Sequence, residues 1–428
     1  MPLLKIIILG LSAIFLTGSV AADSNRTRDQ PDETGVLVAV DRLMTDFIAE
    51  QGVPGAALAL VRHGRLIYAR GFGLGDRERG LPVTPRSLFR IASVSKPLTA
   101  AAIMHLVETR RLELERPMLT LLAEAVRHAP GVPEDARLGV VTVRHLLEHT
   151  AGWDRAQSGF FPLRTSSLVA ICRRAGIAPP GTPEIVVAHM LAQPLEFFPG
   201  TRFAYANIGY LILGRVITAV SGEPYETYVR NHLLLPLGIR DMQIGGSYRD
   251  NRAPGEVCYY SAFDARVEAA FGPMRGQQIP LPYARSIEIQ EAAGGWLASA
   301  VDLARFLAAF HNAHPLAILE PQTVRRMVSP PSAAPPAAMA DHPIAYGLGW
   351  FVERDEQGRR IVYHTGRLPG SGAYIGWRSD GLGVVVLFNS DTNRHNAPLV
   401  RLFLTALAPV VDGIAVWPAH DLFPHYFP

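Results

Sequence analysis

Hydrophobic residues recur at helical spacing in the segment 36–48, and the pattern stops before Gly52 and Pro54, residue types that end helices. The two segments that follow, 56–61 and 65–69, are rich in aliphatic residues and read as strands. His63-Gly64 lies between them and is a two-residue connection suited to a tight hairpin. After its first 35 residues the chain is therefore predicted to form a helix and then a β-hairpin.

A second helical stretch opens at Ser93 and runs to about Arg110. Pro97 is compatible with this helix because it falls in the first turn, where its missing N–H has no intrahelical partner. From about residue 112 to 300 the periodicity is mostly helical, with loop-rich interruptions such as 178–183.

Beyond a Pro- and Ala-rich connection at 329–336 the pattern becomes extended again, and a final helix is predicted at about 396–406. The predicted strands are 347–352, 361–363, 373–378 and 382–389. Strands at both chain ends with a helical middle predict an α/β protein in which one antiparallel sheet, flanked by helices, is built from both termini. The sheet region would comprise about 36–111 and 300–407, with a largely helical insertion at about 112–299 and a tail at 408–428.

The first 22 residues have the features of a secretory signal peptide: Lys5, an apolar stretch at 6–16, and small residues at 19–22. We expect cleavage after Ala21 or Ala22 and a periplasmic or secreted protein. The alternative is an uncleaved anchor, although the apolar run is shorter than the ~20 residues that a span requires. No later apolar run is long enough, so no stable membrane span is expected after cleavage.

Composition narrows the class of protein. With 428 residues, 48% of them hydrophobic, the chain can bury a large core, and its formal net charge is only +3. The arginines are scattered and form no basic run, so a nucleic-acid partner is not expected. Cys172 and Cys258 could pair in an oxidising compartment or remain two small buried thiols, and spacing alone leaves both possibilities open.

Lys96 is the only lysine other than Lys5 among 41 basic residues, and it follows Ser93 by three positions. On a helix, positions i and i+3 share a face, so the hydroxyl and the amine can meet. An amine can lose its proton when it is desolvated, whereas a guanidinium cannot. The pair is therefore typical of a serine nucleophile with its base; the alternative is a chance surface lysine.

Two further groups of polar residues suit a cleft. Tyr205 and Asn207 follow the tight turn Pro199-Gly200, and a phenol near a protonated lysine can ionise below its usual pKa of about 10. His364-Thr365-Gly366-Arg367 follows a predicted strand, and Gly366 would let a substrate approach the backbone closely. Each group alone is weak, since a packed tyrosine and a strand ending in Thr-Gly are both common.

In order along the chain, Ser93-x-x-Lys96, Tyr205-x-Asn207 and His364-Thr365-Gly366 resemble the three motifs of the serine β-lactamase and penicillin-binding-protein superfamily, in particular the branch of class C β-lactamases, D-amino peptidases and carboxylesterases. The stretches 146–152 and 293–295 also look like that branch, and the resemblance covers about 36–407, which would be the hydrolase domain.

The resemblance implies a role for each motif residue. Ser93 would be acylated, Lys96 and Tyr205 would share the proton transfers, and Asn207 would bind the acyl side of the substrate. It also implies substrate-binding positions and an oxyanion hole formed by the backbone N–H groups of Ser93 and Arg367. The implied substrate-binding residues are Asn207, His364, Thr365, Gly366 and Arg367.

Two departures from the family pattern affect the expected substrate: Ala206 replaces the middle serine of the second motif, and His364 replaces the lysine of the third. The missing cation favours short neutral esters or amides over β-lactams, unless Arg367 replaces it. With an ordinary pKa of about 6.5, His364 would strengthen binding of carboxylates below that pH.

We therefore expect a serine hydrolase that cleaves an ester, amide or peptide substrate through an acyl-enzyme, with no cofactor and no metal. A β-lactamase or D,D-peptidase and a non-catalytic penicillin-binding-like protein are the alternatives within the resemblance. A zinc peptidase using His145, Glu148 and His149 is the alternative of another class, because these residues match H-x-x-E-H. Loops around Trp153, Phe160 and Phe161 would set substrate choice, which the sequence leaves open together with the oligomeric state.

Overall fold

The computed structural model describes residues 37–123, 126, 135–310, 317–329 and 344–428, and Val36–Pro428 forms one compact unit. The predicted signal peptide and most of the Pro- and Ala-rich connection lie outside the described residues. Within the described part of the chain, no helix combines the length and the apolar character needed to cross a bilayer.

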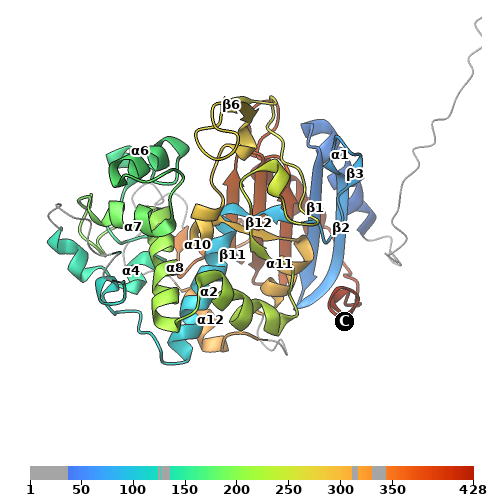
Figure 1. The fold of residues 1–428 in the computed structure, drawn as a ribbon. Coiled ribbons are helices and arrows are strands. Elements are labelled where there is room, and N and C mark those ends of the chain that lie inside the picture. The colour runs from blue at the N-terminus through green and yellow to red at the C-terminus, as the bar shows by residue number, and fades with distance from the viewer. Residues whose placement is uncertain (1–36, 124–125, 127–134, 311–316, 330–343) are drawn as a thin grey trace, which may run out of the picture. The chain divides into compact units, whose positions relative to one another are not determined.

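An eight-stranded sheet forms the centre of this unit, and every pair of neighbouring strands is antiparallel (Figure 1). The neighbouring strands β1 and β13 come from opposite ends of the chain, as the sequence predicted. From one edge to the other the strands are β3 (Leu81–Pro82), β2 (Arg65–Asp76), β1 (Gly55–Arg62), β13 (Leu382–Phe388), β12 (Ser371–Arg378), β11 (Arg360–Leu368), β10 (Phe351–Arg354) and β9 (Ala345–Tyr346).

The hairpin between β1 and β2 turns at His63 and Gly64, as predicted, with φ of +48° and +80°. These left-handed values fit the tight turns that match the twist of a hairpin. A register shift follows the turn, where Leu60 pairs with Tyr68 but Val61 pairs with Leu66. The extra residue leaves backbone groups of β2 without partners on β1.

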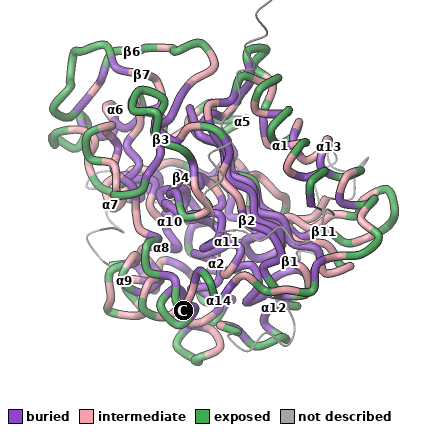
Figure 2. Tube along the Cα trace, turned by 90° about the vertical axis from the view of Figure 1, so that its right-hand side faces the viewer, coloured by how far each residue is buried: buried purple, intermediate pink, exposed green. Residues whose placement is uncertain are grey.

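Helices cover both faces of the sheet, and alternate residues of β1 contribute to two hydrophobic cores. Helices α1 (Val38–Gln51) and α13 (Leu399–Asp412) pack on one face through Phe47 and Phe403, whose rings lie 5.2 Å apart. Helices α2 (Ser95–Glu108) and α11 (Ala300–Ala308) belong to the core on the other face. Figure 2 shows that β1, β2 and α2 are mostly buried.

The middle of the chain is mostly helical, as predicted, but it also contains short strands. Strands of two or three residues are too short to show a period of two in the sequence. The helices are α4 (Val143–Leu147), α5 (Arg155–Ser158), α6 (Thr165–Ala175), α7 (Pro183–Leu191), α8 (Asn207–Ser221), α9 (Tyr225–Val229) and α10 (Glu291–Gly294), followed later by α12 (Pro321–Met327). One small sheet has β8 (Trp296–Ala298) in the middle, paired with β4 (Phe89–Arg90) on one side and β5 (Gln243–Ile244) on the other. The other is the hairpin of β6 (Arg266–Glu268) and β7 (Gln278–Pro280).

The C-terminal segment packs against the register shift in β2. Helix α13 continues past the predicted end near residue 406 to Asp412. Leu66 N–H donates to Asp421 Oδ1 at 3.1 Å, and Leu66 O accepts from Leu422 N–H at 2.8 Å. The last helix, α14 (Phe423–Tyr426), then buries its two aromatic end residues. His420 Nε2–H also donates to the carbonyl oxygen of the extra residue, Ile67, at 2.9 Å, so the final residues supply hydrogen-bond partners to β2 at the shift.

Candidate active site

Ser93 lies in a single 3-10 turn, η2 (Ala92–Val94), immediately before α2. Ala92 has φ +48°, a conformation that costs energy for a residue with a Cβ and that the surrounding structure must impose. The turn packs directly on β11, because a Cβ on Gly366 would lie 2.0 Å from the carbonyl oxygen of Ile91. Ser93 itself is half-buried and lines a cleft of about 500 Å³.

Ser95, the other hydroxyl of this motif, is fully buried and holds the turn together. Its Oγ donates to Ala92 O at 2.7 Å and accepts from Trp296 N–H at 3.3 Å. Ser93 and Ser95 are therefore distinguished by position: the first faces the cleft and the second belongs to the core.

The amine of Lys96 is fully buried between three oxygen atoms. Its Nζ lies 2.7 Å from Asn207 Oδ1, 2.7 Å from Ala293 O and 3.1 Å from Ser93 Oγ. The amide and carbonyl oxygens can only accept, so they take the two hydrogens of a neutral amine. The lone pair of that neutral amine is then directed at the Ser93 hydroxyl.

Burial also sets the protonation of the two groups next to Ser93. The pKa of Lys96 lies well below its usual range, because the amine is desolvated and because the Arg155 cation acts on it. Burial raises the pKa of Tyr205 above its usual value of about 10, against the opposing effect of its hydrogen bond with Ser93. The expectation that Tyr205 ionises readily is therefore wrong, and the phenol keeps its proton.

The backbone around Tyr205 is held by His149. Ala204 N–H donates to His149 O at 2.8 Å, and Ala206 N–H donates to His149 Nδ1 at 3.2 Å. The ring of His149 lies 4.2 Å from that of Tyr205. Asn207 then begins α8, which places its side chain beside Lys96.

His364 is buried and neutral, which corrects the expectation of an ordinary pKa. Its Nδ1–H donates to Thr365 O at 2.8 Å, so Nε2 is the acceptor for the Tyr346 hydroxyl at 3.1 Å. Desolvation and the nearby Lys96 lower the pKa of His364 to about 3. His364 therefore gains no charge near pH 6.5 and cannot replace the missing lysine as a cation.

The edge of β11 next to Ser93 carries Thr365, Gly366 and Arg367. Leu368 and Ser371 close the hairpin to β12, and hydrogen-bonded pairs alternate with open ones along an antiparallel ladder. The N–H of Arg367, one position earlier, therefore points away from β12 toward the cleft. The guanidinium of Arg367 is bound to Asp391, with Nε 3.0 Å from Oδ2, and it stays half-exposed.

The sequence did not single out two other residues that line the cleft, Arg155 and Arg285. Arg155 begins the short helix α5 and Arg285 lies in a loop, and no sequence signal places either residue near Ser93. Of the three aromatic residues expected near the site, Phe161 lines the cleft, and Phe160 and the buried Trp153 border an adjacent cavity.

The geometry of His145, Glu148 and His149 contradicts the zinc-peptidase alternative. Helix α4 ends at Leu147, and His149 has φ +57°, so the motif does not lie on one continuous helical face. His145 Nδ1 accepts from the Thr142 N–H at 3.2 Å, and Glu148 forms an ion pair with an arginine. Across the described part of the chain, the three side chains do not bring ligand atoms to a common point.

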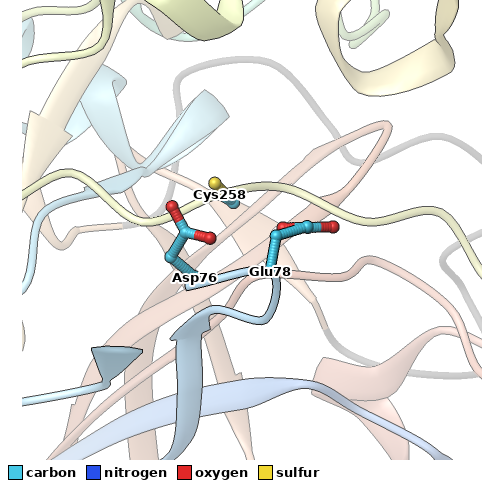
Figure 3. Close-up of side chains that lie close together, drawn as sticks. All are labelled: Asp76, Glu78 and Cys258. Atoms are coloured by element: carbon cyan, nitrogen blue, oxygen red, sulfur yellow. The ribbon is translucent and has the colours of Figure 1, made fainter. Parts of the chain in front are cut away.

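Asp76, Glu78 and Cys258 form the one group of potential metal ligands found among the described residues, with ligand atoms within 4.8 Å of one another (Figure 3). Each carboxylate already faces an arginine: Glu78 is 2.7 Å from Arg249, and Asp76 is 3.5 Å from Arg252. Burial raises the pKa of the Cys258 thiol. These cations argue against a metal here.

Cys172 and Cys258 are both free, buried thiols, so they do not form the disulfide that the sequence left open.

Comparisons with known proteins agree with this geometry. The family model described as Beta-lactamase matches residues 40–406. Esterase EstB of Burkholderia gladioli is 27% identical over 405 residues, covering 89% of this chain and 97% of the esterase. The octameric penicillin-binding protein homologue from Pyrococcus abyssi has a TM-score of 0.65 at 27% identity, over 87% of this chain and 77% of that chain.

A D-amino acid amidase from Ochrobactrum anthropi SV3 shares the fold, with a TM-score of 0.67 at 22% identity over 89% of this chain and 99% of the amidase. The match to the family model extends from helix α1 through the body of α13 and includes all three motifs. The chain therefore belongs to the beta-lactamase family of serine hydrolases.

Proposed function

We propose that the protein hydrolyses an ester or amide through an acyl-enzyme on Ser93. The observation that carries this proposal is the environment of Lys96: two acceptor-only oxygens at 2.7 Å bind the hydrogens of a neutral amine, and Ser93 Oγ lies on the remaining side at 3.1 Å. A chance surface lysine would be exposed, whereas the Lys96 amine is buried and bound on three sides.

In the acylation step, Ser93 Oγ attacks the carbonyl carbon of the substrate while its proton passes to Lys96 Nζ. The substrate oxygen becomes an oxyanion, and the backbone N–H groups of Ser93 and Arg367 are placed to stabilise it. As the bond to the leaving group breaks, the protonated Tyr205 donates its phenolic proton to the leaving oxygen or nitrogen, and Lys96 returns a proton to Tyr205.

In the deacylation step, water attacks the Ser93 ester. The neutral Lys96 accepts the water proton, either directly or through Tyr205, which takes up the water proton as it passes its own proton to Lys96. The Ser93 oxygen then recovers that proton as the product acid leaves. Lys96 and Tyr205 thus regain their initial protonation states at the end of each half of the cycle, and no step uses a metal or a cofactor.

The choice of ester or amide as the substrate class is supported by relatives whose names describe an esterase and a D-amino acid amidase. A neutral His364 in place of the family's lysine argues against a β-lactamase or D,D-peptidase. We also propose export to the periplasm or medium, on the basis of the N-terminal segment at 1–22.

A fluorophosphonate probe followed by peptide mapping tests the proposal. We expect the adduct on Ser93, no labelling of Ser93→Ala and retained labelling of Ser95→Ala. The same sample should hydrolyse p-nitrophenyl esters or amino-acid amides faster than nitrocefin. A folded wild-type protein that neither reacts with the probe nor hydrolyses any of these substrates would identify a non-catalytic penicillin-binding-like protein instead.

A further inference from the structure

We infer that Arg155 and Arg285 form an anion-binding subsite on the wall of the Ser93 cleft, and that they select substrates carrying a carboxylate. This inference rests on the proposed hydrolase function and specifies its substrate class. Both residues lie outside the three sequence motifs, and both line the same cleft as Ser93.

Arg285 is the more enclosed of the two residues. Its side chain is only partly accessible, and burial together with the nearby Arg164 lowers the pKa of its guanidinium. Within the described residues its side chain forms no hydrogen bond or ion pair, and the charge of Asp391, whose carboxylate binds Arg367, only partly opposes the lowering of its pKa. A desolvated guanidinium without a partner is costly, and a substrate anion would supply the missing acceptor.

The backbone that carries Arg285 is fixed. Ala284 O accepts a hydrogen bond from Thr165 Oγ1 at 2.8 Å. On the other side, the buried Arg90 donates to Pro282 O at 2.7 Å. Little reorganisation is therefore required for Arg285 to bind a ligand, which favours affinity.

Arg155 opens helix α5 on another side of the cleft, and its side chain is exposed. The carboxylate of the adjacent Asp154 binds other groups: one oxygen accepts from Ala156 N–H and caps α5, and the other lies 2.8 Å from Arg202. Arg155 instead lies over the Phe161 ring, 5.7 Å from its centre. Its charge lowers the pKa of both Lys96 and Tyr205, so it acts directly on the reacting groups.

The balance of charge in the cleft favours an anion. Asp391 is the only carboxylate among the lining residues described, and both of its oxygens are occupied, one by Arg367 and the other by Gly370 N–H at 2.9 Å. His364 is neutral near pH 7, and burial holds the pKa of Lys96 well below its usual range. The uncompensated charge is therefore that of Arg155 and Arg285, and a carboxylate matches the planar geometry of a guanidinium.

The test compares two matched esters, the mono-p-nitrophenyl ester of adipic acid and p-nitrophenyl hexanoate, which have the same acyl length but differ by one carboxylate. A second pair, 4-acetoxybenzoate and phenyl acetate, places the carboxylate on the leaving group. We expect wild type to prefer the charged member of at least one pair in kcat/KM. Raising the ionic strength from about 0.05 to about 0.5 M should reduce that preference and leave the neutral ester unaffected.

In Arg285→Gln and Arg155→Gln we expect KM for the preferred charged ester to rise at least about tenfold, the effect of losing one charge-assisted hydrogen bond. Arg285→Lys should recover part of the loss. Arg42→Gln, an exposed change of the same kind on α1, should have no effect. Hydrolysis of the neutral esters with no preference for the charged ones would overturn the subsite alone. No hydrolysis of any ester and no labelling of Ser93 would instead overturn the proposed function.

Discussion

The imidazole of His149 accepts a hydrogen bond from the backbone N–H of Ala206 at 3.2 Å, while the backbone oxygen of the same histidine accepts from Ala204 at 2.8 Å. One residue thus binds the chain on both sides of Tyr205. Burial and the nearby Lys96 hold the pKa of His149 well below its usual range, so Nδ1 remains available as an acceptor.

Replacing this acceptor should displace Tyr205. We expect His149→Leu to lower kcat by about 10- to 100-fold with little change in KM, because a small misplacement of a reacting group is costly. His149→Asn keeps a side-chain acceptor and tolerates the positive φ at this position, so it should lose less. Steady-state kinetics on both variants, with thermal melts to establish folding, provide the measurement. Equal losses in the two variants would contradict a role for the Nδ1 hydrogen bond.

The neutral amine of Lys96 should be essential for turnover. Lys96→Arg keeps a cation but cannot accept a proton, so we expect a loss of at least ~100-fold in kcat. Single-turnover kinetics with a p-nitrophenyl ester would locate the loss in acylation. Turnover close to that of wild type would exclude Lys96 as the proton acceptor.

Lys96 should also make the stability of the folded protein depend on pH. The pKa of Lys96 is lowered in the folded state, whereas in the unfolded chain it is about 10.4. At a pH between these two pKa values, the unfolded chain binds a proton on Lys96 that the native protein does not bind. Wild type should therefore gain stability relative to Lys96→Met as the pH rises from 7 toward about 10. Thermal melts of the two proteins over this range test the sign, and a constant difference in Tm would show that the amine is already charged in the native state.

His364 should show the corresponding effect in acid. Its folded pKa is about 3, and its unfolded value is about 6.5, so protonation of the unfolded chain reduces native stability as the pH falls between these values. We expect wild type to lose stability faster than His364→Gln between pH 6.5 and 4 in urea titrations. Binding of a carboxylate-bearing ester should not strengthen across pH 6.5, since His364 stays neutral there.

Arg90 should be a major determinant of stability near the site. It is 1% exposed, its Nε lies 3.7 Å from Glu256 Oε1, and its Nη atoms donate to three backbone carbonyls. Arg90→Met would leave the buried Glu256 without its cation, so the free energy of unfolding should fall by about 3–5 kcal/mol. Glu256→Gln, which keeps a hydrogen-bonding group, should cost less. An unfolding free energy of Arg90→Met equal to that of Arg42→Gln would contradict this assignment.

The sequence predicted the sheet and the three motifs because both are local signals. Runs of alternating or continuous apolar residues mark β1, β2, β12 and β13, and the Ser93–Lys96 spacing brings those side chains together by helix geometry alone. The burial of His364 was also detectable, because it follows the buried Val362 by two residues and therefore lies on the same face of the strand.

Contacts between distant segments were not predictable. The partner of His364, Tyr346, lies in a two-residue strand just before the segment that the pattern marked. Arg155, at the start of the short helix α5, and Arg285, in a loop, reach the cleft along paths that depend on packing, for example the bond from Thr165 to Ala284 O. A single sequence carries no periodic signal for such placements.

The pairing of β1 with β13 also determines when this protein can fold. Ala56 lies opposite Phe388, so the first long strand is made long before its neighbour exists. At synthesis rates of about 5–20 residues per second, β1 waits on the order of tens of seconds with one edge unpaired. The nascent chain therefore holds an apolar, aggregation-prone edge until almost all of it has been translated, and any product truncated before Leu382 lacks the strand that joins the two halves of the sheet.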